Sequence, residues 1–183
     1  DKLGYKHKLK SKTGKNPGGG VAFIYRDTLN VKQIDLPKEF SELESIVCKV
    51  SGPYIDEYTI ATYYNNPKLE INIRFLEWLT TFENCLLMGD LNSKHPNLFC
   101  IKKNANGQLL VDSLESEQSP LNLCYLNDKS MTKHPLRKNK ESPELLDMSF
   151  CHPNIRSKIL SFNVGFSYGS NHSNISVIIP LKN

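Results

Sequence analysis

Two polar side chains that can act on a phosphate follow a short apolar run near the middle of the chain. The run Leu86–Met88 ends in Gly89, and Asp90 and Asn92 come next, two positions apart. Such runs are typical of buried strands, and we expect Gly89 to let the backbone leave this strand sharply. If the chain stays extended, alternation puts both side chains on one side. The carboxylate would then hold a cation or orient water beside the amide; the alternative is a Gly-Asp turn that caps the next segment.

A second acidic residue interrupts another apolar segment. Asp147 lies within the predicted strand 144–150, and a buried lone carboxylate is costly unless it is hydrogen-bonded or paired. A histidine would serve as its partner, and the predicted turn 169–173 holds His172.

Strands outnumber helices in the predicted secondary structure. Helical spacing predicts a helix over 69–82 and a shorter one preceded by 104–107. β-rich runs, several of them alternating, predict strands at 21–25, 31–36, 46–50, 58–64, 85–88, 121–126, 144–150, 159–164 and 175–179. Many strands with few helices favour two packed sheets with helices outside.

Composition narrows the class of protein. With 183 residues, of which 39% are hydrophobic, we expect one domain with a substantial core. No run approaches the roughly 20 apolar residues of a spanning helix, and we expect no membrane partner. No signal peptide is visible, and the start at Asp1 rather than Met leads us to expect a piece of a longer protein.

The five cysteines are widely spread and include no CxxC pair, which argues against disulfide frameworks and zinc ribbons. We expect them to be buried free thiols. Free thiols favour a reducing compartment, either the cytoplasm or the nucleus.

Basic residues gather in two places, and the net charge of +4 permits a nucleic-acid partner. Residues 1–17 are predicted to be a solvated arm or a lysine-guarded edge strand, or to contact phosphates. Gly18–Gly20 is predicted to be a turn that lets backbone approach closely, and it lacks the Lys-Ser/Thr of a P-loop. A proline-broken basic loop follows with Lys133, Arg137, Lys138 and Lys140.

The order of these segments resembles the endonuclease/exonuclease/phosphatase family, and within it the apurinic-endonuclease-like endonuclease domain of non-LTR retrotransposons. The resemblance covers residues 18–180 and is carried by Gly18–Ala22, Thr62–Pro67, Gly89–Asn92, Leu146–Met148 and Ser170–His172. It implies a DNase I-like α/β fold, in which two mostly antiparallel sheets form a sandwich flanked by helices. Residues 1–17 would be a basic arm, and 18–183 a domain that lacks its N-terminal strands.

The resemblance also implies a role for each site residue. Asp90 would align the attacking water or share a metal, and Asn92 and Tyr64 would hydrogen-bond the phosphate. His172 would contact the phosphoryl group, while Asp147 would orient and charge the imidazole. The implied cofactor is Mg²⁺ (or Mn²⁺), which prefers oxygen ligands and neutralises developing negative charge.

Two departures from the family pattern weaken the metal site. No counterpart of the family's phosphate-binding Asn and metal-ligand Glu precedes Gly18, and Glu44 is expected to open the next strand instead. The family's Ser-Asp-His reads Ser170-Asn171-His172, so Asn171 would be a weakened, uncharged metal position. Losing one charge-assisted contact of roughly 1.5–3 kcal/mol would lower metal affinity about tenfold or more. We therefore expect a truncated or degenerate copy with low activity.

The implied reaction is metal-dependent nicking of target DNA, so that a linked reverse transcriptase downstream of Asn183 can prime on the new 3′ hydroxyl. Lys133, Arg137, Lys138 and Lys140 would contact the DNA backbone, or would simply form a solvated loop. Two alternatives stay open. One is a catalytically dead remnant that binds nucleic acid or protein. The other is a phosphoesterase of the same fold acting on RNA, sugar phosphates or lipid headgroups, although the basic segments favour a polymer.

Overall fold

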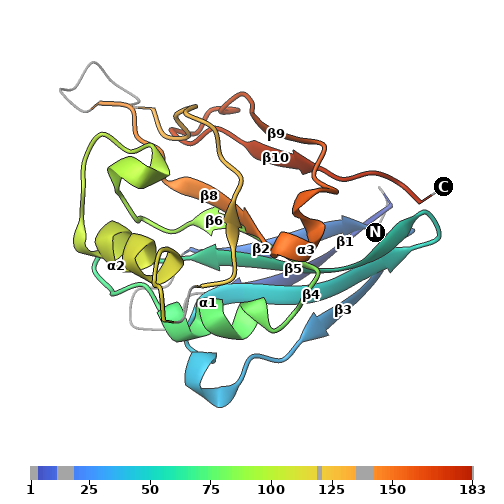
Figure 1. The fold of residues 1–183 in the computed structure, drawn as a ribbon. Helices are drawn as coiled ribbons and strands as arrows, with labels where there is room; N and C mark the ends of the chain where they lie inside the picture. The colour runs from blue at the N-terminus through green and yellow to red at the C-terminus, as the bar shows by residue number, and fades with distance from the viewer. Residues whose placement is uncertain (1–3, 12–18, 119–120, 135–141, 183) are drawn as a thin grey trace.

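A six-stranded sheet forms the middle of the molecule in the computed structural model, which describes residues 4–11, 19–118, 121–134 and 142–182 (Figure 1). Its strand order is β3-β4-β5-β6-β8-β7, and only β5 and β6 pair in parallel. The strands are β3 (Asn30–Ile34), β4 (Glu44–Gly52), β5 (Ile55–Tyr64), β6 (Cys85–Asp90), β7 (Cys124–Tyr125) and β8 (Asp147–Cys151).

Two antiparallel ribbons cover one face of this sheet. The first pairs β1 (Tyr5–Ser11) with β2 (Gly20–Arg26), and the second pairs β9 (Ser161–Val164) with β10 (Ile175–Ile178). The first packs Val21 and Phe23 against the β4 side chains, whereas the second packs Phe162 and Val177 near Leu86 and Cys151. The second layer of the sandwich is therefore divided into two ribbons.

The two longer helices cover the opposite face, whereas the shortest α-helix packs Ile155 with Leu86 and Cys151 on the ribbon side. The helical segments are α1 (Ile73–Thr80), α2 (Ala105–Leu114), α3 (Pro153–Arg156) and two short 3-10 turns, η1 (Lys38–Phe40) and η2 (Pro96–Leu98). The α1 side chain of Phe75 lies edge-on to Tyr63 of β5, with ring centroids 5.2 Å apart, and both rings are buried. The predicted two-sheet, DNase I-like sandwich flanked by helices is thus confirmed.

Asparagine caps set the starts of the two longer helices. The Asn72 side chain accepts a hydrogen bond from the Phe75 amide, so α1 begins later than the predicted residue 69, and Leu69 is exposed. Asn104 likewise caps α2, which therefore includes Asn106 and Gly107. Both positions follow the preference of asparagine for accepting from the first-turn amides.

Two strand predictions need correction. β7 is only two residues long where 121–126 was predicted. The Leu121 amide donates to the Ser113 carbonyl rather than to β8, and after Leu126 the Asn127 side chain binds the Asp147 carbonyl and the Ser149 amide. The alternating pattern of residues 46–50 is typical of a half-buried strand, yet in β4 Val47 and Cys48 are both buried because both faces of the sheet are covered. Glu44 opens β4, as expected.

The N-terminal segment pairs along most of its described length. Tyr5–Ser11 form a strand that pairs with β2, so this part of the basic segment is a strand and not a solvated arm. Gly19 and Gly20 have φ values of 91° and 130°, and a Cβ on Gly19 would meet nothing within 4 Å. Glycine at position 19 therefore allows a left-handed backbone conformation, and the predicted close approach of another backbone segment is not found there within the described part of the chain. The division of the chain at residues 17 and 18 stays a prediction.

The five cysteines are free thiols, and Cys124 alone among them is only partly buried. Among the described residues, none of the helices has the length and apolar character needed to cross a lipid bilayer.

Candidate active site

Three predicted site residues lie where neighbouring strands of the central sheet begin or end. Tyr64 is the last residue of β5, Asp90 is the last of β6, and Asp147 is the first of β8. Asp90 and Asp147 face each other in the antiparallel register, and the Asn65 amide donates to the Asp90 carbonyl at 2.9 Å. Because residues paired in register project to the same face, the two carboxylates share the face that the ribbons cover.

The fourth residue, His172, comes from the connection between β9 and β10. Its Nδ1 lies 2.8 Å from Oδ2 of Asp147, and the two side chains are only 29% and 17% exposed. The predicted need of Asp147 for a hydrogen-bonding partner is therefore met by this imidazole. An imidazole held on one nitrogen by a carboxylate presents its other nitrogen in a fixed direction.

Burial and like charge perturb the Asp90 carboxyl. Burial raises the pKa of Asp90 to about 6, and the nearby Asp147 charge adds to the increase; the Asn92 amide, His172 and Lys133 act against it. Near neutral pH this group can therefore exchange a proton, which suits a general base.

Tyr64 is a phenol beside two carboxylates. Burial, followed by the charges of Asp90 and Glu44, raises the pKa of Tyr64 above its ordinary value. Glu44 lies directly opposite it in the β4–β5 register. The hydroxyl consequently stays protonated at neutral pH and can donate a hydrogen bond to an anionic ligand.

The residues present fit a hard divalent cation. One ligand atom from each of Asp90, Asp147 and His172 lies within 4.8 Å of the others. Two carboxylates provide oxygen ligands of the kind that Mg²⁺ and Mn²⁺ prefer. A cation would also relieve the repulsion from Asp147, which adds to burial in raising the pKa of Asp90. Asn171 precedes His172, and its carbonyl accepts from the His134 amide at 2.7 Å. Its role as a metal ligand stays a prediction.

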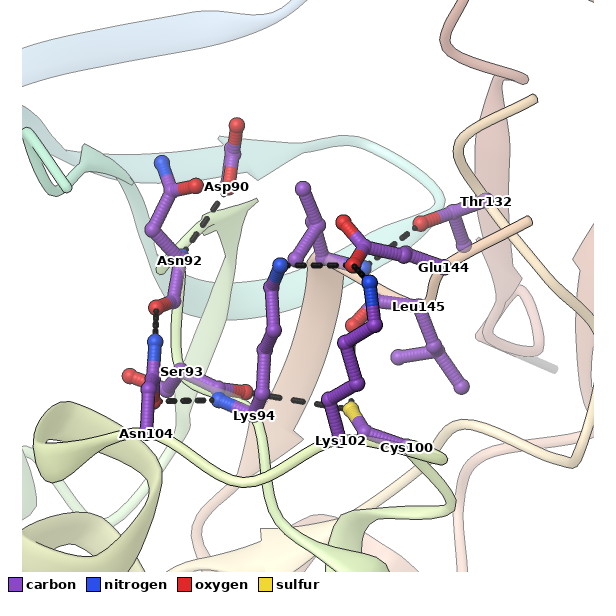
Figure 2. Close-up of polar contacts among 11 residues, drawn as sticks. Asp90, Asn92, Ser93, Lys94, Cys100, Lys102, Asn104, Thr132, Glu144 and Leu145 are labelled. Atoms are coloured by element: carbon purple, nitrogen blue, oxygen red, sulfur yellow. Dashed lines mark hydrogen bonds and ion pairs between the residues drawn. The ribbon is translucent and has the colours of Figure 1, made fainter. Parts of the chain in front are cut away.

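The turn after the central strand differs from the expected one. The strand runs through Gly89 to Asp90, and the left-handed residue is Asn92, with φ of 47°. Gly89 is required for another reason: a Cβ there would lie 2.0 Å from the carbonyl oxygen of Tyr63. The Asn92 amide donates to Oδ1 of Asp90 at 3.0 Å and its Nδ2 donates to the Asn65 carbonyl at 2.9 Å. Figure 2 shows the Asp90 and Asn92 side chains projecting the same way.

Sequence reasoning missed the residue that joins Asp147 to His172. Buried Thr132 accepts hydrogen bonds on Oγ1 from the Leu146 and Asp147 amides, at 3.0 and 2.9 Å. Its carbonyl accepts from the Ser173 amide at 2.7 Å. One side chain and one carbonyl thus position both members of the pair, and no local pattern around Thr132 signals this role.

Asn104 was also missed as a site-supporting residue (Figure 2). Its Oδ1 accepts from the Lys94 and Gly107 amides, and its Nδ2 donates to the Asn92 carbonyl, each at 2.8 Å. A Cβ on Gly107 would lie 2.0 Å from the Lys94 carbonyl oxygen, so the helix start and the loop pack without space between them. The cap of α2 therefore also holds the backbone of Asn92.

An ion pair links this loop to the segment that leads into β8. Nζ of Lys94 lies 2.7 Å from Oε1 of Glu144, with side chains 23% and 17% exposed (Figure 2). Lys102 approaches the same oxygen at 3.8 Å.

The predicted DNA-contacting lysines and arginine are only partly described. Lys133 forms backbone bridges with both Glu144 and His172, and its charge partly opposes the increase in the pKa of Asp90 that burial causes. Arg137, Lys138 and Lys140 lie outside the described residues.

Solved structures similar to this chain share its fold. The endonuclease domain of TRAS1, a telomere-specific non-LTR retrotransposon, has a TM-score of 0.76 at 22% identity, over 97% of this chain and 81% of that one. A 3′-5′ exonuclease from Neisseria meningitidis gives 0.65 at 15% identity, over 98% and 81%. Cimex nitrophorin, solved as a ferrous NO complex, gives 0.54 at 14% identity, over 100% and 76%.

At the level of sequence, no curated protein matches the chain. A family model does match: residues 58–176, more than half of the chain, fit the family described as Endonuclease-reverse transcriptase. The chain therefore belongs to the endonuclease-reverse transcriptase family.

Proposed function

We propose that this chain hydrolyses phosphodiester bonds of DNA, as the endonuclease part of a protein that also carries a reverse transcriptase. The observation that carries the proposal is the pairing of His172 with Asp147, directly beside the perturbed carboxyl of Asp90. Family membership and the TRAS1 likeness support the same class of reaction. Nicking of chromosomal DNA would supply the 3′ hydroxyl from which the reverse transcriptase extends.

Each side chain has a distinct part in the proposed reaction. Asp90 orients the attacking water, either by accepting a hydrogen bond from it or through the cation that Asp90 would hold. The imidazole of His172, held by Asp147, donates to a phosphate oxygen as negative charge develops there. The hydroxyl of Tyr64 and the side-chain amide of Asn92 donate to other oxygens of the same phosphate.

Mg²⁺ or Mn²⁺ would be held mainly by Asp90, with Asp147 and the uncharged Asn171 nearby, and when bound would neutralise charge on the phosphate. We propose that activity is low, because Asn171 contributes no negative charge to this position. Lys133, Arg137, Lys138 and Lys140 are proposed to contact the DNA backbone.

The absent charge at Asn171 also favours the second candidate, a domain that binds DNA without cutting it. Such a protein would retain DNA affinity without any metal-dependent turnover. The same experiment separates the two functions.

A supercoiled-plasmid nicking assay with Mg²⁺, Mn²⁺ or chelator tests the proposal. Slow metal-dependent nicking that Asp90→Ala abolishes would support it. The matched control is Asp56→Ala. Asp56 lies near the start of β5, at the opposite end of that strand from Tyr64, and forms exposed ion pairs with Lys158 and Lys182. DNA binding without nicking would favour the second candidate, and nicking that survives Asp90→Ala would refute the assigned site. Rapid nicking by the unaltered chain would refute the proposed impairment.

A further inference from the structure

The two most exposed large apolar side chains among the described residues lie in one loop close to the candidate active site. Phe166 and Tyr168 are 82% and 85% exposed, and both stand in the connection between β9 and β10 that also carries His172. Large apolar side chains that are exposed next to a site often mark a binding surface.

The backbone conformation of the turn in this loop disfavours tyrosine at position 168. The Ser170 amide donates to the Ser167 carbonyl at 2.8 Å, and the central residues Tyr168 and Gly169 have φ values of 41° and 85°. Turns with positive φ at both central positions prefer Asn-Gly, because bulky residues are strained there. Tyrosine is therefore placed against both backbone preference and the hydrophobic effect, as happens at functional positions.

Hydrogen bonds on both sides tie the turn to the site. On one side, the Gly165 amide donates to the Asn174 carbonyl and the Asn174 amide to the Phe166 carbonyl, at 2.8 and 3.2 Å. On the other, the His134 amide donates to the Asn171 carbonyl. The His172 amide itself donates to Oγ of Ser170 at 3.0 Å. The aromatic side chains therefore stand on the same backbone framework as the imidazole.

We propose that Phe166 and Tyr168 form a stacking platform for a nucleobase of the DNA strand that is cut, an inference that rests on the proposed function. Every base presents a flat apolar face that stacks on aromatic rings. A base can reach such a platform only when it leaves the duplex stack. The preferred substrate class is therefore DNA with an unpaired or easily unstacked base beside the cut, such as a bulge or mismatch.

Charge favours a nucleic acid over an apolar protein partner here. Lys133 and the exposed His134 lie on the segment hydrogen-bonded beside the turn, and Lys133 bridges to His172 through the backbone. The Lys133 cation next to exposed aromatic rings matches the pattern of single-stranded nucleic-acid sites, in which cations contact the backbone and rings receive the bases.

The test compares binding of a short bulged duplex with that of the same duplex fully paired, by fluorescence anisotropy in chelator, which prevents turnover. A fluorescent adenine analogue at the bulge reports stacking. The unaltered chain should bind the bulged duplex more tightly and quench the analogue. Phe166→Ala and Tyr168→Asn should each bind it about tenfold more weakly or worse, and the preference for the bulge should shrink.

Two controls separate stacking from folding. Tyr168→Asn should leave the melting temperature unchanged or raised, because asparagine is favoured in this turn, and Tyr168→Phe should keep the binding. Tyr54→Ala removes a 68% exposed aromatic ring just before β5, at the end of that strand away from Tyr64, and should bind like the unaltered chain.

Equal affinity of Tyr168→Asn and the unaltered chain for both duplexes would overturn the platform. Plasmid nicking, measured alongside, keeps the two proposals distinct. Nicking with unchanged binding in both aromatic variants would remove the platform and leave the nuclease. Ring-dependent bulge binding without nicking would keep the platform and remove the nuclease.

Discussion

The two halves of the candidate active site are held in place by different means. Asp90 and Asn92 belong to one stretch of chain, and Asn104, a few residues later, holds that stretch by its backbone. Asp147 and His172 come from segments 25 residues apart, and Thr132 from a third segment connects them.

The two halves should also differ in how easily a substitution disrupts them. The first half depends on local turn chemistry and on strand pairing, which many contacts share. In the second, strand pairing holds Asp147, but the link between Asp147 and the His172 segment passes through one residue, Thr132, whose buried hydroxyl accepts from two amides and whose carbonyl accepts from the Ser173 amide. We therefore expect the second half to be the more easily damaged.

Among the substitutions that separate the two halves, Thr132→Val is expected to lower stability the most. Valine keeps the shape but leaves the buried Leu146 and Asp147 amides without an acceptor, which should cost about 2–4 kcal/mol of unfolding free energy. Urea denaturation measures the loss, and Thr132→Ser, which keeps the hydroxyl, is the control. A loss as small as that of Thr132→Ser would show that the second half does not depend on this residue.

Asp90→Asn should stabilise the protein in chelator at neutral pH. Because the folded-state pKa of Asp90 is raised to about 6, the native state binds a proton more tightly than the unfolded chain. Stability from this group is therefore lost as pH rises from about 4 to about 6, by roughly 1–3 kcal/mol. Thermal melts across this range should show Asp90→Asn gaining over the unaltered protein as pH rises, and parallel curves would contradict the electrostatic account.

Asn171→Asp should strengthen metal binding in the second half, because it places a negative charge next to His172. One added charge-assisted ligand would tighten Mg²⁺ binding about tenfold, from a contact worth roughly 1.5–3 kcal/mol. Nicking rates titrated with Mg²⁺ should reach half-maximum at a lower concentration. Asn163→Asp, on the exposed part of β9, is the control for net charge, and an equal shift there would refute a local effect.

The smallest effect is expected from Asn104→Ser in the first half. Serine can still cap α2 but loses the donor to the Asn92 carbonyl, so stability should fall by about 1 kcal/mol. The main change should be a several-fold lower kcat for nicking with little change in KM, because Asn104 positions the loop without touching DNA. An altered KM with unchanged kcat would instead place Asn104 in substrate binding.

The parts of the site that the sequence could predict are those with a local pattern. An apolar run ending in Gly-Asp-Leu-Asn indicated the end of β6, and a lone acid in an apolar segment indicated that Asp147 needs a partner. The roles of Thr132 and Asn104 depend on which backbone groups the fold brings beside them, so no local pattern carries them.

The same reason explains the misinterpreted glycine. Gly89 looks like a turn residue in sequence, yet it is required by the Tyr63 carbonyl of the neighbouring parallel strand. Close approach between strands is a property of the sheet, whereas a left-handed turn is a property of one residue. For the two-layer fold, alternation and turn residues were sufficient to predict the packed sheets. They did not predict that the second layer is divided into two ribbons.

The most direct test of the central claim is a double-mutant cycle between Asp147 and His172, read out as metal-dependent plasmid nicking. If the carboxylate acts through the imidazole, Asp147→Asn and His172→Gln should each slow nicking by about 10²-fold or more. The double variant should then be no slower than the slower single variant. Additive losses, or nicking that survives both substitutions, would contradict a shared catalytic pair at this site.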